Sequence, residues 1–145
     1  SFNDLALGET RTTSVSYTIS DGHGGTLTAS LVITVTGIND LPVAVGSIPP
    51  QNSAGQEVIS LSVRSAFADS DTTDRLSFRA TGLPSGLSID ATTGLISGRI
   101  SSTAAYTGPY TVTVEATDPQ GASVAQTFVW NVQNPDLVVH IDAQE

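Results

Sequence analysis

The sequence predicts an all-β protein, and three observations support this class. Val, Ile, Leu and Ala alternate with Ser and Thr over long stretches, which is the two-residue period of half-buried strands. No stretch of helix-forming residues carries a helical apolar period. The chain also has 13 Gly, and three of them form the cluster Gly22, Gly24 and Gly25 between two alternating stretches. These features are typical of strands joined by tight turns.

Two hairpins are expected, one near each end of the chain. The first has alternating strands at 14–20 and 27–35 around an Asp-Gly turn. The second has strands at 109–117 and 123–132 around a turn that begins at Asp118. The turn aspartates of the two hairpins are 97 positions apart, and the aspartates after each second strand are 96 apart. The hairpins therefore form an internal repeat of roughly 97 residues.

A repeat of that length is the size of an immunoglobulin-like sandwich, and it divides the chain. We expect residues 1–38 to be the C-terminal part of a preceding module, 39–42 a junction, 43–134 a complete module, and 135–145 a linker or the first strand of a next module. The complete module would form a seven-strand Greek-key sandwich with strands at 43–48, 58–63, 76–80, 87–89, 95–100, 109–117 and 123–132. Residues 1–38 supply too few strands to bury both faces of a sheet, so they should lean on a neighbour, dimerise or fray.

The charge balance excludes several classes of partner. Fourteen carboxylates face five Arg and no Lys, so the net charge is −9, which repels nucleic acid and anionic membranes and suits a divalent cation. Cys is absent, which excludes disulfides and Cys-based zinc sites. No apolar run approaches the length of a membrane span, and no signal peptide begins the chain, which reads as an excerpt of something longer.

Acidic residues at one end of the sandwich predict a calcium site. The loops after the second, fourth and sixth strands lie at the end where the chain enters, so acids there should converge on the junction. The predicted set is Asn39, Asp40, Asp69, Asp71 and Asp118, and Glu9 could reach it from the preceding segment. Carboxylates so close together repel unless a cation neutralises them, and an oxygen-only shell suits Ca²⁺ better than Mg²⁺ or zinc.

A plainer interpretation exists for each aspartate, because Asp often caps backbone amides in turns. We expect Asp21, Asp90 and Asp142 to have that role. Similarly, Tyr110 and Trp130 fall at core positions of their strands, whereas Tyr106 lies in a loop and is the one plausible exposed aromatic platform.

Two motifs resemble known families. Residues 81–90 (TGLPSGLSID) and 93–98 (TGLISG), with FADSD at 67–71 and ATDPQG at 116–121, resemble bacterial Putative Ig and dystroglycan-type cadherin-like domains over 43–134. Residues 5–9, 16–22 and 37–42 resemble the C-terminal part of a VCBS-type repeat of RTX adhesins. These resemblances imply a cadherin-like fold, tandem modules outside or on the surface of a bacterial cell, and folding aided by Ca²⁺. The cadherin likeness implies that Glu9, Asn39 with Asp40, Asp69 with Asp71, and Asp118 match that family's calcium ligands.

Two functions follow as hypotheses. The first is a calcium-binding structural module that acts as a rigid extender in a large bacterial adhesin, with the neighbouring modules of the same chain as its partners. The second is a module that itself binds polysaccharide or another cell-surface protein. We do not expect an enzyme, because the sequence shows no nucleophile elbow, no Ser-His-acid set and no phosphate-binding Gly loop.

Overall fold

A computed structural model describes residues 2–134, and these form strands and two short 3-10 helices. The all-β prediction is confirmed. The chain divides into two compact units: Ser1–Leu41 with Asp69–Asp74, and Pro42–Ala68 with Arg75–Glu145. The loop 69–74 thus belongs to the first unit although its neighbours in sequence belong to the second. The strand expected after residue 135, and Asp142 with it, lie outside the described residues.

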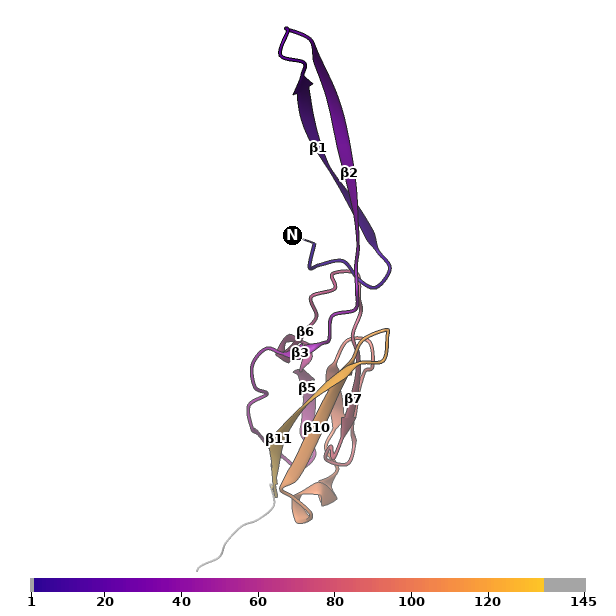
Figure 1. Cartoon of the computed structure of the whole chain (residues 1–145). Coiled ribbons are helices and arrows are strands. Elements are labelled where there is room, and N and C mark those ends of the chain that lie inside the picture. The colour runs from indigo at the N-terminus through magenta and orange to yellow at the C-terminus, as the bar shows by residue number, and fades with distance from the viewer. Residues whose placement is uncertain (1, 135–145) are drawn as a thin grey trace, which may run out of the picture. The chain divides into compact units, whose positions relative to one another are not determined.

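The first unit is dominated by a long antiparallel hairpin (Figure 1). Strands β1 (Thr10–Ser20) and β2 (Thr26–Thr36) pair along their whole length, from Thr10 opposite Thr36 to Ser20 opposite Thr26. Asp21 closes the turn, because its Oδ1 accepts hydrogen bonds from the backbone N–H of His23 at 2.8 Å and of Gly25 at 2.9 Å. The turn role predicted for Asp21 is confirmed.

A small buried contact joins the base of this hairpin to the start of the chain. Leu5 and Ala6 are buried, and Gly37 passes directly over them. A Cβ at Gly37 would lie 2.3 Å from the carbonyl oxygens of both residues, so only glycine fits there. The N–H of Gly37 donates to the carbonyl of Glu9 at 2.8 Å, and the N–H of Gly8 donates to the carbonyl of Gly37 at 3.2 Å. This buried contact therefore holds residues 5–9 against the segment that leads to Asn39.

The second unit is a two-sheet sandwich. One sheet has the order β4 (Gln51–Ala54), β11 (Ser123–Gln133), β10 (Tyr110–Thr117), β7 (Ser77–Thr81), and the other has β5 (Val58–Ser62), β9 (Leu95–Arg99), β8 (Leu87–Ile89). Only β4 pairs in parallel, with β11. The chain crosses between sheets from β7 to β8 and from β9 to β10, which gives the predicted Greek-key sandwich. The 3-10 helices are Arg64–Ala66 (η1) and Ser102–Tyr106 (η2).

The beginning of the sandwich differs from the prediction. Instead of one strand at 43–48, the chain forms β3 (Val43–Ala44), which pairs with β6 (Phe67–Ala68), and then β4 beyond Pro50. The break has two causes. Gly46 adopts φ 139°, a conformation that L side chains rarely adopt, and Pro49 and Pro50 lack the N–H that a continuous strand would use.

The core between the two sheets confirms the predicted roles of the aromatic residues. Trp130 is 1% exposed, and its indole N–H donates to Ser53 Oγ at 3.3 Å. Tyr110 packs against the core, while its hydroxyl donates to the carbonyl of Ala104 at 2.9 Å. The fully buried set on the facing strands includes Ile96, Val112, Val114 and Ala116. Asp90 caps its turn as expected, because its Oδ1 accepts from the N–H groups of Thr92 and Thr93.

Candidate functional site: an acidic loop of the first unit

The loop 69–74, which follows β6, holds the acidic residues that the sequence singled out. Asp71 is only 2% exposed, and its Oδ2 accepts a hydrogen bond from the backbone N–H of Asp40 at 2.9 Å. Asp69 Oδ1 accepts from the N–H of Asp71 at 3.0 Å. Both partners of each bond belong to the first unit. The acidic loop is therefore joined to the Asn39-Asp40 segment by the hydrogen bond from Asp40.

Each of the two carboxylates leaves one oxygen buried and without a hydrogen-bond partner, Oδ2 of Asp69 and Oδ1 of Asp71. Leaving such an oxygen unsatisfied costs on the order of 1–3 kcal/mol, and more for a charged group. Asn39 Oδ1 and Asp74 Oδ2 are further buried oxygens of the first unit, although Asn39 and Asp74 also have other interaction partners. Buried oxygens without a donor need a partner, and an ordered water or a cation can supply one.

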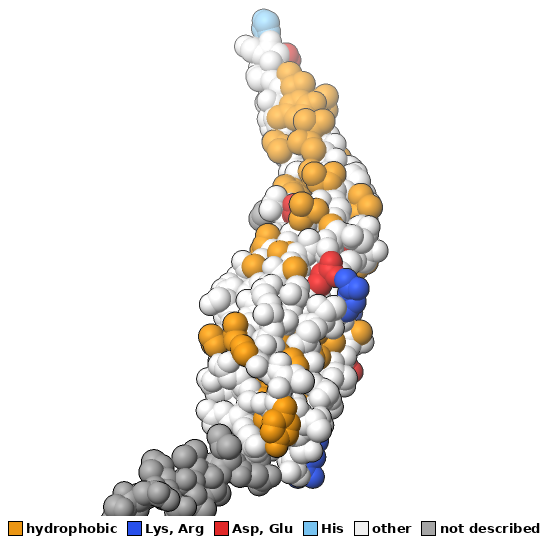
Figure 2. Space-filling view, turned by 90° about the horizontal axis from the view of Figure 1, so that it is seen from below, with side chains coloured by type: hydrophobic (Ala, Val, Ile, Leu, Met, Phe, Trp, Pro, Cys, Tyr) orange, Lys and Arg blue, Asp and Glu red, His pale blue; other side chains and the backbone are white. Residues whose placement is uncertain are grey.

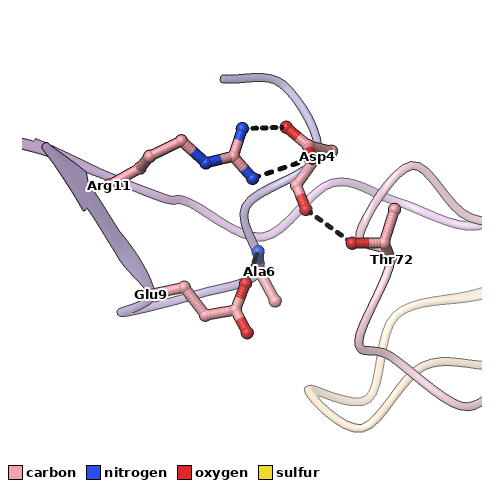
Figure 3. Close-up of polar contacts among 5 residues, drawn as sticks. All are labelled: Asp4, Ala6, Glu9, Arg11 and Thr72. Atoms are coloured by element: carbon pink, nitrogen blue, oxygen red, sulfur yellow. Dashed lines mark hydrogen bonds and ion pairs between the residues drawn. The ribbon is translucent and has the colours of Figure 1, made fainter. Parts of the chain in front are cut away.

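The acidic loop is held from outside by the start of the chain (Figure 3). The carbonyl of Asp4 accepts from the Thr72 hydroxyl at 3.1 Å and from the Thr72 N–H at 3.4 Å. The Asp4 carboxylate in turn forms a bidentate pair with Arg11, with N···O distances of 3.0 and 2.9 Å. Arg11 also lies 5.8 Å from the centre of the Phe2 ring. Residues 2–11 thus brace the acidic loop without using a carboxylate to do so.

Two of the predicted ligands already serve local structure. Glu9 belongs to the first unit, but its Oε2 accepts from the N–H of Ala6 at 3.1 Å, which closes a turn (Figure 3). Asp118 belongs to the second unit and is 4% exposed. Its Oδ1 accepts from the N–H of Ala122 at 2.8 Å, the same capping that Asp21 provides in the first hairpin. A ligand role for either residue stays a prediction.

Sequence reasoning overlooked Asp74 and the carbonyl of Asp4. Asp74 could have been found, because DSDTTD at 69–74 places three acids within six residues. No sequence pattern could have indicated the Asp4 carbonyl, because every residue has a backbone carbonyl. Over residues 2–134 no three His, Cys, Asp or Glu side chains gather as a ready-made metal centre. The candidate ligands are instead the carboxylates of Asp69 and Asp71, with the buried amide oxygen of Asn39.

These donors fit a hard cation that binds oxygen. Every available atom is a carboxylate, amide or carbonyl oxygen, and the chain has no Cys that would favour zinc. Ca²⁺ takes six to eight oxygens in flexible geometry, so it tolerates a site assembled from loop segments better than Mg²⁺ does. The buried unsatisfied oxygens of Asp69 and Asp71 therefore agree with a calcium site.

The ion pair between Asp4 and Arg11 leads to a prediction about the pKa of Asp4. The hydrogen bond from Arg11 holds the pKa of the Asp4 carboxyl below its ordinary value. A carboxyl whose folded pKa is depressed adds stability above its unfolded pKa and loses it as pH falls through the folded pKa. Arg11→Gln should raise the pKa of Asp4 toward its ordinary value, as followed by NMR titration of that carboxyl. Arg99→Gln, whose Nε donates to Gln56, is the control; an unchanged Asp4 pKa in Arg11→Gln would contradict the assignment.

Comparison with known proteins decides the family. The Putative Ig domain family matches residues 41–133, which include the whole of the β3–β11 sandwich. The chain belongs to the Putative Ig domain family. The resemblance to these domains that the TGLPSGLSID and TGLISG motifs carried is thus confirmed. No curated protein matches the sequence.

Solved structures show the same fold at low sequence identity. Protocadherin Gamma B7 cadherin domains 1–4 align with 83% of this chain and 32% of that one, at 20% identity and TM-score 0.58. Protocadherin Gamma B2 domains 1–5 align with 85% and 25%, at 14% identity and TM-score 0.55. A nucleoside hydrolase-related protein from Saccharophagus degradans aligns with 66% and 26%, at 17% identity and TM-score 0.50. The chain spans a third or less of each, and these likenesses show a cadherin-like and immunoglobulin-like fold.

Proposed function

We propose that this Putative Ig domain is a calcium-binding structural module of a large secreted or surface-attached bacterial adhesin, in which it acts as an extender. The observation that carries the proposal is the buried, unsatisfied oxygen on each of Asp69 and Asp71 in a loop closed onto Asp40. The cadherin-like fold, the net charge of −9 and the likeness of residues 5–42 to VCBS-type repeats support the same function. No helix among residues 2–134 is long and apolar enough to cross a membrane.

The chain's own connectivity suggests how such a module would stiffen. The acidic loop packs in the first unit, yet its two ends continue directly into β6 and toward β7 of the second unit. Asp71 holds the loop to the backbone of Asp40, and Thr72 holds it to Asp4. Calcium, when bound, supplies two positive charges that offset the repulsion between the carboxylates. The loop would then be held on three sides, and the chain segments that leave it would lose freedom.

Direct binding tests the proposal. Isothermal titration with CaCl₂ should show binding in the range of about 10⁻⁴ to 10⁻³ M that is typical of extracellular modules. MgCl₂ should bind more weakly, because Mg²⁺ demands octahedral geometry and gives up its waters reluctantly. Absence of calcium binding at 10 mM, roughly ten times the weakest expected Kd, would refute the proposal.

The alternative, a module that binds polysaccharide or another cell-surface protein directly, rests on one side chain. Tyr106, at the end of η2, is 73% exposed, and its hydroxyl accepts from Asn134 Nδ2 at 3.1 Å. Sugar sites normally place aromatic rings in a groove with several polar groups. A surface hollow of about 140 Å³ on the second unit does not include Tyr106 but is lined by residues that include Val45, Ile48, Leu61 and Ser65. The extender is therefore the better supported function.

A further inference from the structure

The first hairpin carries an apolar face that nothing covers within the first unit. Residues directly opposite each other in an antiparallel pair point to the same side of the sheet. By the β1–β2 register, Val35 and six exposed large apolar residues lie on one side. We call these six the hairpin apolar face: Val15, Tyr17, Ile19, Leu27, Leu31 and Ile33. Their exposed fractions lie between 43% and 68%. Figure 2 shows hydrophobic side chains gathered along the hairpin.

The opposite side of the hairpin has the chemistry of a solvated surface. It is made almost entirely of Ser and Thr, with Val32 as the exception. Hydroxyl pairs bridge the two strands there, Ser16 with Ser30 at 3.5 Å and Thr18 with Thr28 at 3.3 Å. Such a clean division into an apolar and a polar face is typical of a sheet that packs on one side against a second layer.

The second unit shows what covers such a face. The pairing Val15 with Leu31 in β1–β2 corresponds, 97 positions later, to Val112 with Phe128 in β10–β11. The registers of the two hairpins agree along their shared length, and each turn is capped by its aspartate in the same way. Val112 and Phe128 are 0% and 4% exposed, whereas Val15 and Leu31 are 54% and 55% exposed.

The covering layer in the second unit is the three-stranded sheet β5–β9–β8. It contributes Ile59 and Ile96 to the core, at 9% and 0% exposure, together with partly buried Leu61 and Leu87. We propose that the hairpin apolar face docks a sheet of this kind: three antiparallel strands that present Ile and Leu side chains, so that hairpin and partner sheet complete a second sandwich. The occupant is such a sheet and not another copy of the hairpin, because in the register-matched hairpin the covering layer is this wider sheet.

The test exploits the absence of cysteine from the chain. A chimera places a duplicate of residues 43–99 directly before Asn3, which preserves the spacing of 97 between the duplicate and the hairpin. Leu31→Cys reports on the apolar face, and Ser30→Cys, the adjacent residue on the polar face, is the matched control. Maleimide should label both cysteines at similar rates in the unextended chain. In the chimera it should label Leu31→Cys at least about tenfold more slowly while Ser30→Cys is unaffected.

A second chimera tests the proposal without a duplicate, because the duplicated segment could fail to fold. It replaces residues 107–133 with residues 10–36, so that β5–β9–β8 meets the first hairpin in the position of β10–β11. Slow maleimide labelling of the grafted Leu31→Cys, with Ser30→Cys still labelled rapidly, supports the proposal. Slow labelling of position 31 in either chimera is sufficient. Failure of both chimeras to protect position 31 overturns it. Protection in the unextended chain, with a dimer by light scattering, also overturns it, because the occupant is then a second copy.

Discussion

Asp69→Asn/Asp71→Asn should abolish the effect of calcium on thermal unfolding. For the wild type, 10 mM CaCl₂ adds about 1.4–2.7 kcal/mol of stability for a Kd of roughly 10⁻³ to 10⁻⁴ M, by mass action. That corresponds to an increase in Tm of several degrees over EGTA. The double variant keeps the backbone hydrogen bonds to Asp40 and Asp71, because an amide oxygen can still accept them, but it lacks the charges that bind the cation.

The double variant also has an expected effect without calcium. In EGTA the wild type keeps two neighbouring carboxylates, Asp69 and Asp71, that each have one buried oxygen without a hydrogen-bond partner. Their repulsion disappears in the Asn variant, which should therefore unfold at the same temperature as the wild type or higher. The matched control is Asp21→Asn/Asp90→Asn, which also removes two charges, but from turns whose aspartates cap backbone amides. The control should keep the full calcium response; loss of the response in both variants would point to a nonspecific effect of charge.

Trp130→Ala should destabilise the sandwich by about 3–5 kcal/mol. The side chain is 1% exposed in the core, packs 6.0 Å from the Phe128 ring centre, and donates to Ser53. Domains of this size have a total unfolding free energy of about 5–15 kcal/mol, so the loss is a large part of it. Urea unfolding followed by circular dichroism measures the change, because the variant lacks the chain's single tryptophan and with it that fluorescence.

Val129→Ala serves as the control for this prediction. Val129 is the preceding residue of β11, is 41% exposed, and points to the opposite side of the sheet. Its truncation should cost less than about 1 kcal/mol. If Trp130→Ala cost no more than Val129→Ala, the tryptophan would not be the central core residue that its burial indicates.

Local pattern was sufficient for the long strands but not for the short ones. Alternation over seven or more residues predicted β1 from residue 14 onward, together with β2, β10 and β11, and the Asp turns predicted how these strands are joined. By contrast, β6 has two residues and β4 four, too few for any period to emerge. They are strands because β3 and β11 lie alongside and pair with their backbones, which is a long-range event.

For the candidate site, the sequence by itself determined the chemistry and the tertiary structure decided the geometry. An acidic, oxygen-only donor set and a repeat of roughly 97 residues follow from residue identity and spacing alone. The sequence predicted that Asp69 and Asp71 approach residues 39–40, but only the folded chain showed that Asp71 accepts from the N–H of Asp40. It also showed that Glu9 and Asp118 cap their own turns. The physical reason is that a carboxylate serves equally well as an amide cap or a metal ligand, and the choice depends on which donors the distant chain brings within hydrogen-bond reach.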